Sequence, residues 1–169
     1  AMLNKLQELK NTRKSGESGF TIIEVMIVLA IAGLILLIVL LAIPALQRNS
    51  RNTAIKNDVS AVSAAISEFK SNNDGALPDN AVVAGTSGKL TISGPAATTT
   101  EAEGRVQAGT DVTLAGAAPT EPGKITVNYK KKCQSSTSAT LNNSVRSTAI
   151  LYNIETTTAS GVAIRCIDA

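Results

Sequence analysis

The stretch GFTIIEVMIVLAIAGLILLIVLLAIPAL, residues 19–46, decides the fold of this chain. From Phe20 to Leu46 it runs for 27 residues and contains a single charged side chain, Glu24. A helix needs about 20 residues to cross a bilayer, whereas the apolar part of a secretory signal has about 7 to 15. No clear small-x-small cleavage site follows the stretch. We therefore predict an anchor helix that is retained in the protein.

The net charge of the chain comes mostly from the residues before this stretch. The formal net charge is +3, and residues 1–19 hold four bases and two acids. The residues after Gly19 therefore hold 16 − 4 = 12 bases and 13 − 2 = 11 acids, which weakens any nucleic-acid interpretation drawn from the isoelectric point. Because bases before a membrane helix favour a cytoplasmic N-terminus, we expect an N-in, C-out orientation. Arg48, Arg51 and Lys56 on the far side reduce this contrast.

Beyond the apolar segment the pattern becomes amphipathic. Apolar residues recur at intervals of 4, 3, 4 and 3 and form one stripe on a helix: Ile55, Val59, Val62, Ile66 and Phe69. Asn72-Asn73-Asp74-Gly75 then provides helix-stopping and turn residues. One helix from about Phe20 to about Asn72 would be about 80 Å long. Pro44 should bend or locally unwind it, because proline removes a backbone donor.

The remainder of the chain consists of short β-prone runs separated by Gly, Pro, Asn and Ser. Strands are expected at 89–93, 112–115, 124–130, 145–154 and 162–167, and the stretch 94–109 is expected to be mainly loop. We predict an α+β fold in which a small antiparallel sheet packs on the stripe of the second half-helix. With only Phe20, Phe69, Tyr129 and Tyr152 as aromatic residues, the core must consist largely of Val, Ile, Leu and Ala.

The cysteine and histidine content limits the chemistry of the chain. There are two cysteines, Cys133 and Cys166, and no histidine. A disulfide in an oxidising compartment explains two cysteines beyond a membrane segment, and free buried thiols are the alternative. Histidine-dependent catalysis is excluded, and the sequence shows no phosphate loop, metal cluster or nucleophile–base pattern. We expect neither an enzyme nor a cofactor.

The residues Gly19-Phe20-Thr21-Ile22-Ile23-Glu24-Val25, preceded by a basic leader and followed by the apolar run, resemble the class III signal of type IV pilins. The resemblance is specific from the leader through Gly33 to about Arg51, and looser beyond. It implies that a prepilin peptidase cuts between Gly19 and Phe20 and methylates the new amine of Phe20. It also implies that residues 1–19 form a disposable leader.

Glu24 is unusual because placing a carboxylate in hydrocarbon costs a few kcal/mol. With the family resemblance, cleavage gives Phe20 a cationic amine, and Glu24 of one subunit can pair with the amine of a neighbour in a filament. The alternatives are that Glu24 reaches the headgroup region or pairs with the amine of its own chain, four residues back.

The other site residues have competing interpretations. Gly33 permits close helix packing, or is simply a tolerated glycine. Pro44 lies three residues later than the proline usual in many relatives, and we expect a melted helix segment near it in a filament. Cys133 and Cys166 match the family's C-terminal disulfide, which bounds either an exposed variable region or only a local staple. Lys130, Lys131 and Lys132 are in most such cases a solvated strand end, with DNA contact as the alternative.

These interpretations give a layout of four parts: leader 1–19, membrane and assembly half-helix 20–46, amphipathic half-helix 47–73, and β-rich domain 74–169 with the disulfide-bounded region 133–166. The resemblance implies a structural pilus subunit for adhesion, twitching motility or DNA uptake, and alternatively a minor pilin or a pseudopilin of a secretion or competence system. Expected partners are other pilin subunits, prepilin peptidase, and the assembly platform and motor. The subunit would begin in the cytoplasmic membrane and end in an extracellular pilus.

Overall fold

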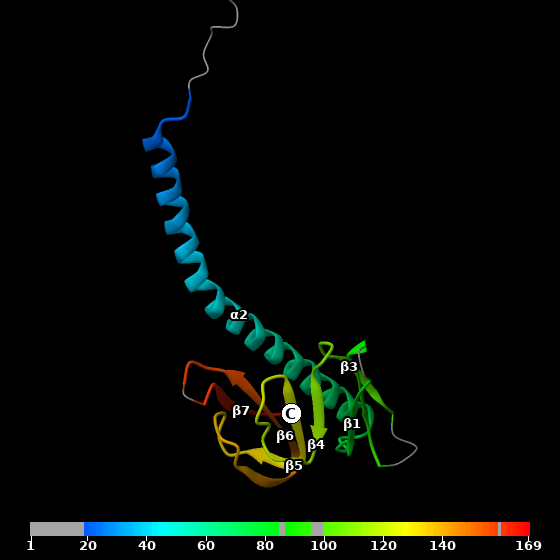
Figure 1. The fold of residues 1–169 in the computed structure, drawn as a ribbon. Helices are drawn as coiled ribbons and strands as arrows, with labels where there is room; N and C mark the ends of the chain where they lie inside the picture. Colours follow the sequence, from blue (N-terminus) through cyan, green and yellow to red (C-terminus); the bar gives the residue numbers. More distant parts are fainter. Residues whose placement is uncertain (1–18, 85–86, 96–99, 159) are drawn as a thin grey trace, which may run out of the picture. The chain divides into compact units, whose positions relative to one another are not determined.

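The computed structural model describes residues 19–84, 87–95, 100–158 and 160–169. The predicted leader lies outside this part of the chain except for Gly19. The elements are one long helix, α2, followed by seven described strands (Figure 1). The chain divides into two compact units between Pro44 and Ala45, and each unit is described by itself below.

The long helix predicted from the apolar run and the stripe is confirmed. Helix α2 spans Ile22–Asn72, which is 51 residues. Pro44 lies inside it, and helical structure continues on both sides. Local unwinding at Pro44 is therefore not observed, because a helix held by its other backbone hydrogen bonds can tolerate the loss of one donor. A bend there, and a melted segment in a filament, remain predictions.

In the second unit, the apolar stripe of α2 forms one wall of the core. All five predicted stripe residues are buried, and Val62, Ile66 and Phe69 are completely inaccessible to solvent. The helix ends as the Asn-Asp-Gly sequence predicted: the backbone N–H of Gly75 donates to the carbonyl of Lys70 at 2.7 Å, and Gly75 has a φ of 80°. Glycine suits this left-handed position because it has no Cβ.

Two sheets complete the second unit. The first is antiparallel in the order β1 (Asn80–Ala84), β2 (Lys89–Ser93) and β3 (Ala102–Arg105). The second has the order β4-β5-β6-β7, formed by the strands Asp111–Leu114, Lys124–Cys133, Leu141–Glu155 and Val162–Asp168. Strands β5, β6 and β7 pair antiparallel, whereas β4 pairs parallel with β5. The α+β class is confirmed, with one sheet that is mixed.

Several details differ from the sequence-based expectation. Strand β1 was not predicted, and β3 lies inside the stretch 94–109 that was expected to be loop. The sequence of β3, Ala-Glu-Gly-Arg, lacks the branched side chains that indicate a strand. The strand packs closely against α2 and β2, since a Cβ on Gly104 would lie 3.4 Å from side-chain atoms of both Ala65 and Leu90.

The core lies between α2 and the sheets. Buried aliphatic side chains from both sheets, including Leu90 and Ile92 of the first and Ile125, Val127 and Ile150 of the second, form one cluster with the stripe of α2. Figure 1 shows the C-terminal half of α2 running along these strands. A second, smaller cluster contains Ala149, Leu151 and Cys166, with Ala118 packed against it. The second sheet is therefore covered on both faces.

The predicted disulfide is confirmed. Cys133 and Cys166 are bonded, with their Cα atoms 5.8 Å apart and a separation of 33 positions in sequence. The bond joins the end of β5 to β7, which are separated by β6 in the sheet. It therefore closes the hairpin and the following strand into one covalently linked region.

Reducing this disulfide should destabilise the second unit. Releasing a 33-residue loop costs about 3 to 4 kcal/mol in the chain-entropy model. We expect reduced wild type and a Cys133→Ala/Cys166→Ala variant to lose about this much free energy of unfolding, measured by urea denaturation in non-ionic detergent. The two proteins control for each other, because only the variant changes side-chain volume. A loss below about 1 kcal/mol in both would contradict the prediction.

Candidate functional site

The N-terminus of α2 is fixed by Thr21. This residue precedes the helix, and its side-chain Oγ1 accepts a hydrogen bond from the backbone N–H of Glu24 at 3.3 Å. Its carbonyl accepts from the N–H groups of Glu24 at 3.1 Å and Val25 at 3.3 Å. Thr21 is thus the N-cap, in a Thr-x-x-Glu pattern that is typical of a capping box. The sequence analysis did not assign this role, although the spacing was visible.

The cap leaves the predicted cleavage site outside the helix. Gly19 and Phe20 have no regular secondary structure, and Phe20 is 83% exposed. An added Cβ at Gly19 would meet no atom within 4 Å. The Gly19–Phe20 bond is therefore neither hydrogen-bonded into the helix nor shielded by described parts of the chain. Such a bond can enter a protease site without first unwinding helix.

Glu24 lies in the first turn of α2 and is exposed. A carboxylate at this end is favoured by the unpaired N–H groups and the positive end of the helix dipole. Among the residues that the structure describes, no cation lies within 4.0 Å of its carboxylate. Glu24 is therefore available for a partner that this single chain does not provide.

The apolar half of α2 is not covered by any other part of the chain that the structure describes. Its large side chains are exposed throughout, and the most apolar 18-residue window is 0% buried. By length and composition, this helix is suited to cross a membrane. A core helix of a soluble protein would be mostly buried, which this half is not. At Gly33 a Cβ would meet nothing within 4 Å, so packing within the chain does not require glycine there.

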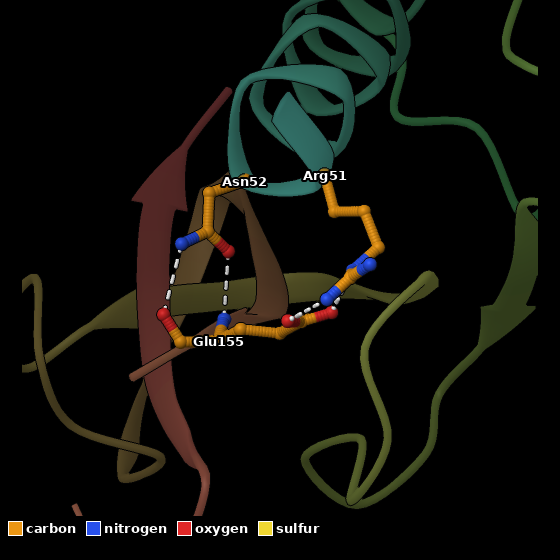
Figure 2. A network of polar contacts seen from close by, with 3 residues as sticks. All are labelled: Arg51, Asn52 and Glu155. Carbon is orange, nitrogen blue, oxygen red and sulfur yellow. Dashed lines mark hydrogen bonds and ion pairs between the residues drawn. The ribbon is translucent and has the colours of Figure 1, made fainter. Parts of the chain in front are cut away.

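A polar clamp, formed by Arg51, Asn52 and Glu155, connects α2 to the end of β6 (Figure 2). Arg51 binds the Glu155 carboxylate with two nitrogens, Nε to Oε1 at 2.5 Å and Nη2 to Oε2 at 2.7 Å. Asn52 Nδ2 donates to the Glu155 carbonyl at 2.8 Å, and the Glu155 N–H donates to Asn52 Oδ1 at 2.7 Å. Side chain and backbone of Glu155 are therefore both held by the helix.

The clamp changes the acidity of its members. The hydrogen bonds from Arg51 lower the pKa of Glu155, and the same contacts raise the pKa of Arg51. Such two-nitrogen pairing favours the charged carboxylate and fixes its orientation. The sequence analysis missed the clamp because 104 residues separate Arg51 from Glu155, and no local pattern links them.

About two turns further along α2, Asp58 makes a second polar tie. It is 5% exposed, and its carboxylate accepts hydrogen bonds from the Gln107 N–H at 3.0 Å and the Thr110 hydroxyl at 2.5 Å. A cavity of about 430 Å³ lies between the clamp and this tie. Its charged side chains are already bonded to one another or to nearby polar groups. In the described part of the chain, no set of three His, Cys, Asp or Glu side chains could hold a metal ion.

The structure separates the predicted site residues into distinct groups. Gly19 and Phe20 lie just before α2, Glu24 lies in its first turn, and Gly33 lies further along the same apolar half. Cys133 and Cys166 meet in the disulfide. Lys130, Lys131 and Lys132 occupy the end of β5 in the second unit. Their cleavage, assembly and binding roles remain predictions.

Acid should weaken the clamp. Because Glu155 has a lowered pKa in the folded protein, its ion pair stabilises the fold above the ordinary glutamate value of 4.5 and is lost as the pH falls through the lower folded value. Between pH 6.5 and pH 3, Glu155→Gln should therefore lose less stability than wild type, as followed by urea midpoints. Glu103→Gln, which removes the exposed pair with Lys89, should keep the wild-type loss. Equal losses in all three proteins would contradict the prediction.

Comparison with known proteins identifies the N-terminal segment. Residues 14–40 match the family model described as the prokaryotic N-terminal methylation motif. No curated protein and no solved structure gives a significant match to the chain. The matched range contains Gly19, Phe20, Glu24 and Gly33, and it ends within the uncovered half of α2. The chain therefore carries the N-terminal methylation motif that is the class III signal of type IV pilins, on a long apolar helix.

Proposed function

We propose that this chain is a prepilin whose mature form is a structural subunit of a type IV pilus filament. The observation that carries the proposal is the methylation motif at residues 14–40, which includes the start of an apolar half-helix that no described residue covers. An exposed apolar surface of this extent must be covered by lipid or by another protein. A subunit that moves from membrane to filament meets this requirement in both states.

The first step in the proposed sequence is processing. Prepilin peptidase hydrolyses the Gly19–Phe20 bond and transfers a methyl group to the new amine of Phe20. The support is that this bond lies outside the helix and is exposed, while Thr21 holds the helix start two residues from the cut. An N-in orientation places the bond on the cytoplasmic side, where the leader is removed.

The second step is assembly through the apolar half-helix. In the membrane, lipid covers this surface, and in the filament the corresponding helices of other subunits replace the lipid. Glu24 has no cation beside it within the described chain, and its carboxylate would pair with the Phe20 amine of a neighbouring subunit. In a low-dielectric filament core a misplaced subunit would leave both charges unpaired, which is strongly unfavourable.

The folded second unit would then lie on the outside of the filament, and the disulfide-bounded region 133–166 would be exposed on the filament surface. Adhesion, twitching motility or DNA uptake would follow from the filament together with its assembly platform and motor. The alternative is a minor pilin or pseudopilin that uses the same N-terminus to start a short filament. The two are distinguished by abundance, because a major subunit dominates the protein sheared from the cell surface.

Processing can be tested by mass spectrometry of the sheared surface fraction. We expect a mature chain that begins at Phe20 and carries one added methyl group on its amine, because the motif specifies both reactions. Gly19→Leu should remain unprocessed, because a large side chain at the cut hinders entry of the backbone into the protease. An intact leader on a non-filamentous, detergent-soluble wild-type protein would reject the proposal.

Assembly can be tested separately with Glu24→Val. This variant should be cut and methylated normally but give few filaments by electron microscopy, because the Phe20 amine would have no carboxylate partner. Glu24→Asp keeps the charge with a shorter reach and should retain more filaments than the valine variant. Wild-type filament yield from Glu24→Val would remove the assigned role of Glu24 while leaving the processing proposal intact.

A further inference from the structure

A second cavity, of about 210 Å³, lies beside α2 where the apolar run ends, and we call it the Arg48 cavity. Two segments of the second unit line it: Ala45, Arg48, Asn49 and Asn52 of α2, and residues 155–157 at the end of β6. The clamp residues Asn52 and Glu155 also line the cavity of about 430 Å³ near Asp58. The clamp therefore borders both cavities, and the Arg48 cavity is the one nearer to the apolar run along the helix.

The clamp groups that line the Arg48 cavity are bonded within the chain, whereas Arg48 is unpaired. Both amide atoms of Asn52 bond to the backbone of Glu155, and two nitrogens of Arg51 hold its carboxylate. Arg48 is partly buried and forms no ion pair with any residue that the structure describes. The cavity is therefore lined by a guanidinium that has no anionic partner of its own.

The charges and hydrogen-bond donors around the cavity favour an anion. Two positive charges, on Arg48 and Arg51, stand against the single negative charge of Glu155. The hydrogen bonds from Arg51 lower the pKa of Glu155 most, and the charge of Arg48 adds to the lowering, so this carboxylate stays ionised. The Asn49 amide and the Thr157 hydroxyl can donate further hydrogen bonds. A guanidinium beside neutral donors suits a phosphate, whereas a metal cation would find only a carboxylate that Arg51 already holds.

The size and surroundings of the cavity indicate that only part of a larger molecule enters it. Sites for whole small molecules typically measure about 300 to 1,000 Å³, so a cavity of about 210 Å³ suits a smaller group. Ala45 in the lining and the adjacent Leu46 belong to the apolar run, and Leu46 is 71% exposed. An anionic group in the cavity would therefore lie close to exposed apolar residues of the same helix. A phospholipid has this combination, with a phosphate in its headgroup and two apolar chains.

The position of Arg48 along α2 matches the level of the lipid headgroups. The 47 − 24 = 23 residues at positions 25–47 carry no charge, and they measure about 35 Å as helix. Because the hydrocarbon core of a bilayer is about 30 Å thick, a spanning helix would place Glu24 and Arg48 in opposite headgroup regions. In the N-in orientation, Arg48 lies on the side where lysine and arginine are less common. The clamp accounts for Arg51 on that side, and a lipid phosphate would account for Arg48.

We propose that the Arg48 cavity binds the phosphate of a phospholipid in the leaflet that faces away from the cytoplasm. The guanidinium of Arg48 binds the phosphate oxygens, Asn49 and Thr157 donate to the same group, and the acyl chains lie along the apolar run. This inference rests on the membrane-inserted state of the proposed function, before the subunit enters a filament. The bound lipid holds the start of the second unit at the membrane surface until the subunit leaves the membrane.

The test is native mass spectrometry of the mature full-length chain in non-ionic detergent, titrated with dioctanoyl phosphatidylglycerol. Wild type should form a saturable one-to-one complex. Arg48→Gln should raise the dissociation constant about tenfold, because a charge-assisted hydrogen bond to phosphate is lost, and Thr157→Val should raise it about threefold. The matched control, Lys56→Gln, removes an exposed base of the same helix that does not line the cavity, and it should bind as wild type does.

Two further probes separate the lipid from its parts. Dioctanoylglycerol lacks the phosphate and glycerol 3-phosphate lacks the chains, so each should bind wild type about tenfold or more weakly than the lipid. Binding of either probe as tightly as the lipid would overturn the proposal. Equal lipid affinities of Arg48→Gln and Lys56→Gln would also overturn it, as would absence of a wild-type complex. Wild-type far-UV circular dichroism and an intact disulfide show that each variant is folded.

Processing and filament yield distinguish this inference from the proposed function. Arg48→Gln should still be cut after Gly19 and form filaments, because Glu24 and the apolar run are unchanged. Filament loss together with wild-type lipid affinity would assign Arg48 to a contact with a neighbouring subunit and overturn the lipid site. Lipid binding is measured on the isolated chain, so a chain that forms no filaments would reject the pilus role without affecting this result.

Discussion

The apolar half of α2 imposes the constraint on which the rest of the protein depends. Its large side chains are exposed, and no contact among the described residues removes them from water. Burial of apolar surface stabilises by about 25 cal/mol per Å², and leucine and isoleucine side chains alone contribute about 1.5 to 3 kcal/mol each. Such a segment is stable only in lipid or against similar helices. A basic segment before it and a free carboxylate within its first turn are consistent with controlled transfer between these two environments.

The second unit must be stable without help from this helix half. Its core has few aromatic residues and relies on aliphatic side chains between α2 and two short sheets. One covalent bond and one set of polar contacts supplement this core. The disulfide joins β5 to β7, and the clamp joins α2 to β6. Asp58 is buried with both carboxylate oxygens hydrogen-bonded, which avoids the cost of an unpaired buried charge. Specific ties of this kind position the helix on the sheets.

A structural feature could be predicted from the sequence when the residues that determine it lie close together along the chain. The helix stripe was predicted correctly because its period is local, and the strands β2, β5, β6 and β7 carry branched residues. Strand β3 was missed because Ala-Glu-Gly-Arg lacks branched side chains. The parallel pairing of β4 with β5 was missed because the sequence indicates the two strands but not the path of the chain between Leu114 and Lys124. The pairing of Arg51 with Glu155 joins two distant segments, for which one sequence contains no signal. By contrast, the processing motif is contiguous and was visible at once.

The same difference in range separates the two surfaces of the protein. The proposed cutting and assembly would depend on a few adjacent residues, because the peptidase would bind an exposed segment of backbone and the filament core would contain a single helix from each subunit. The contacts of the second unit instead exist only after folding: Arg51 of α2 binds Glu155 at the end of β6, and Lys70 of α2 donates to the Arg146 carbonyl of β6. Substitutions at exposed positions of the second unit can therefore change its surface without touching the residues to which assembly is assigned. A protein organised in this way can keep its N-terminus fixed while its second unit acquires different surface chemistry.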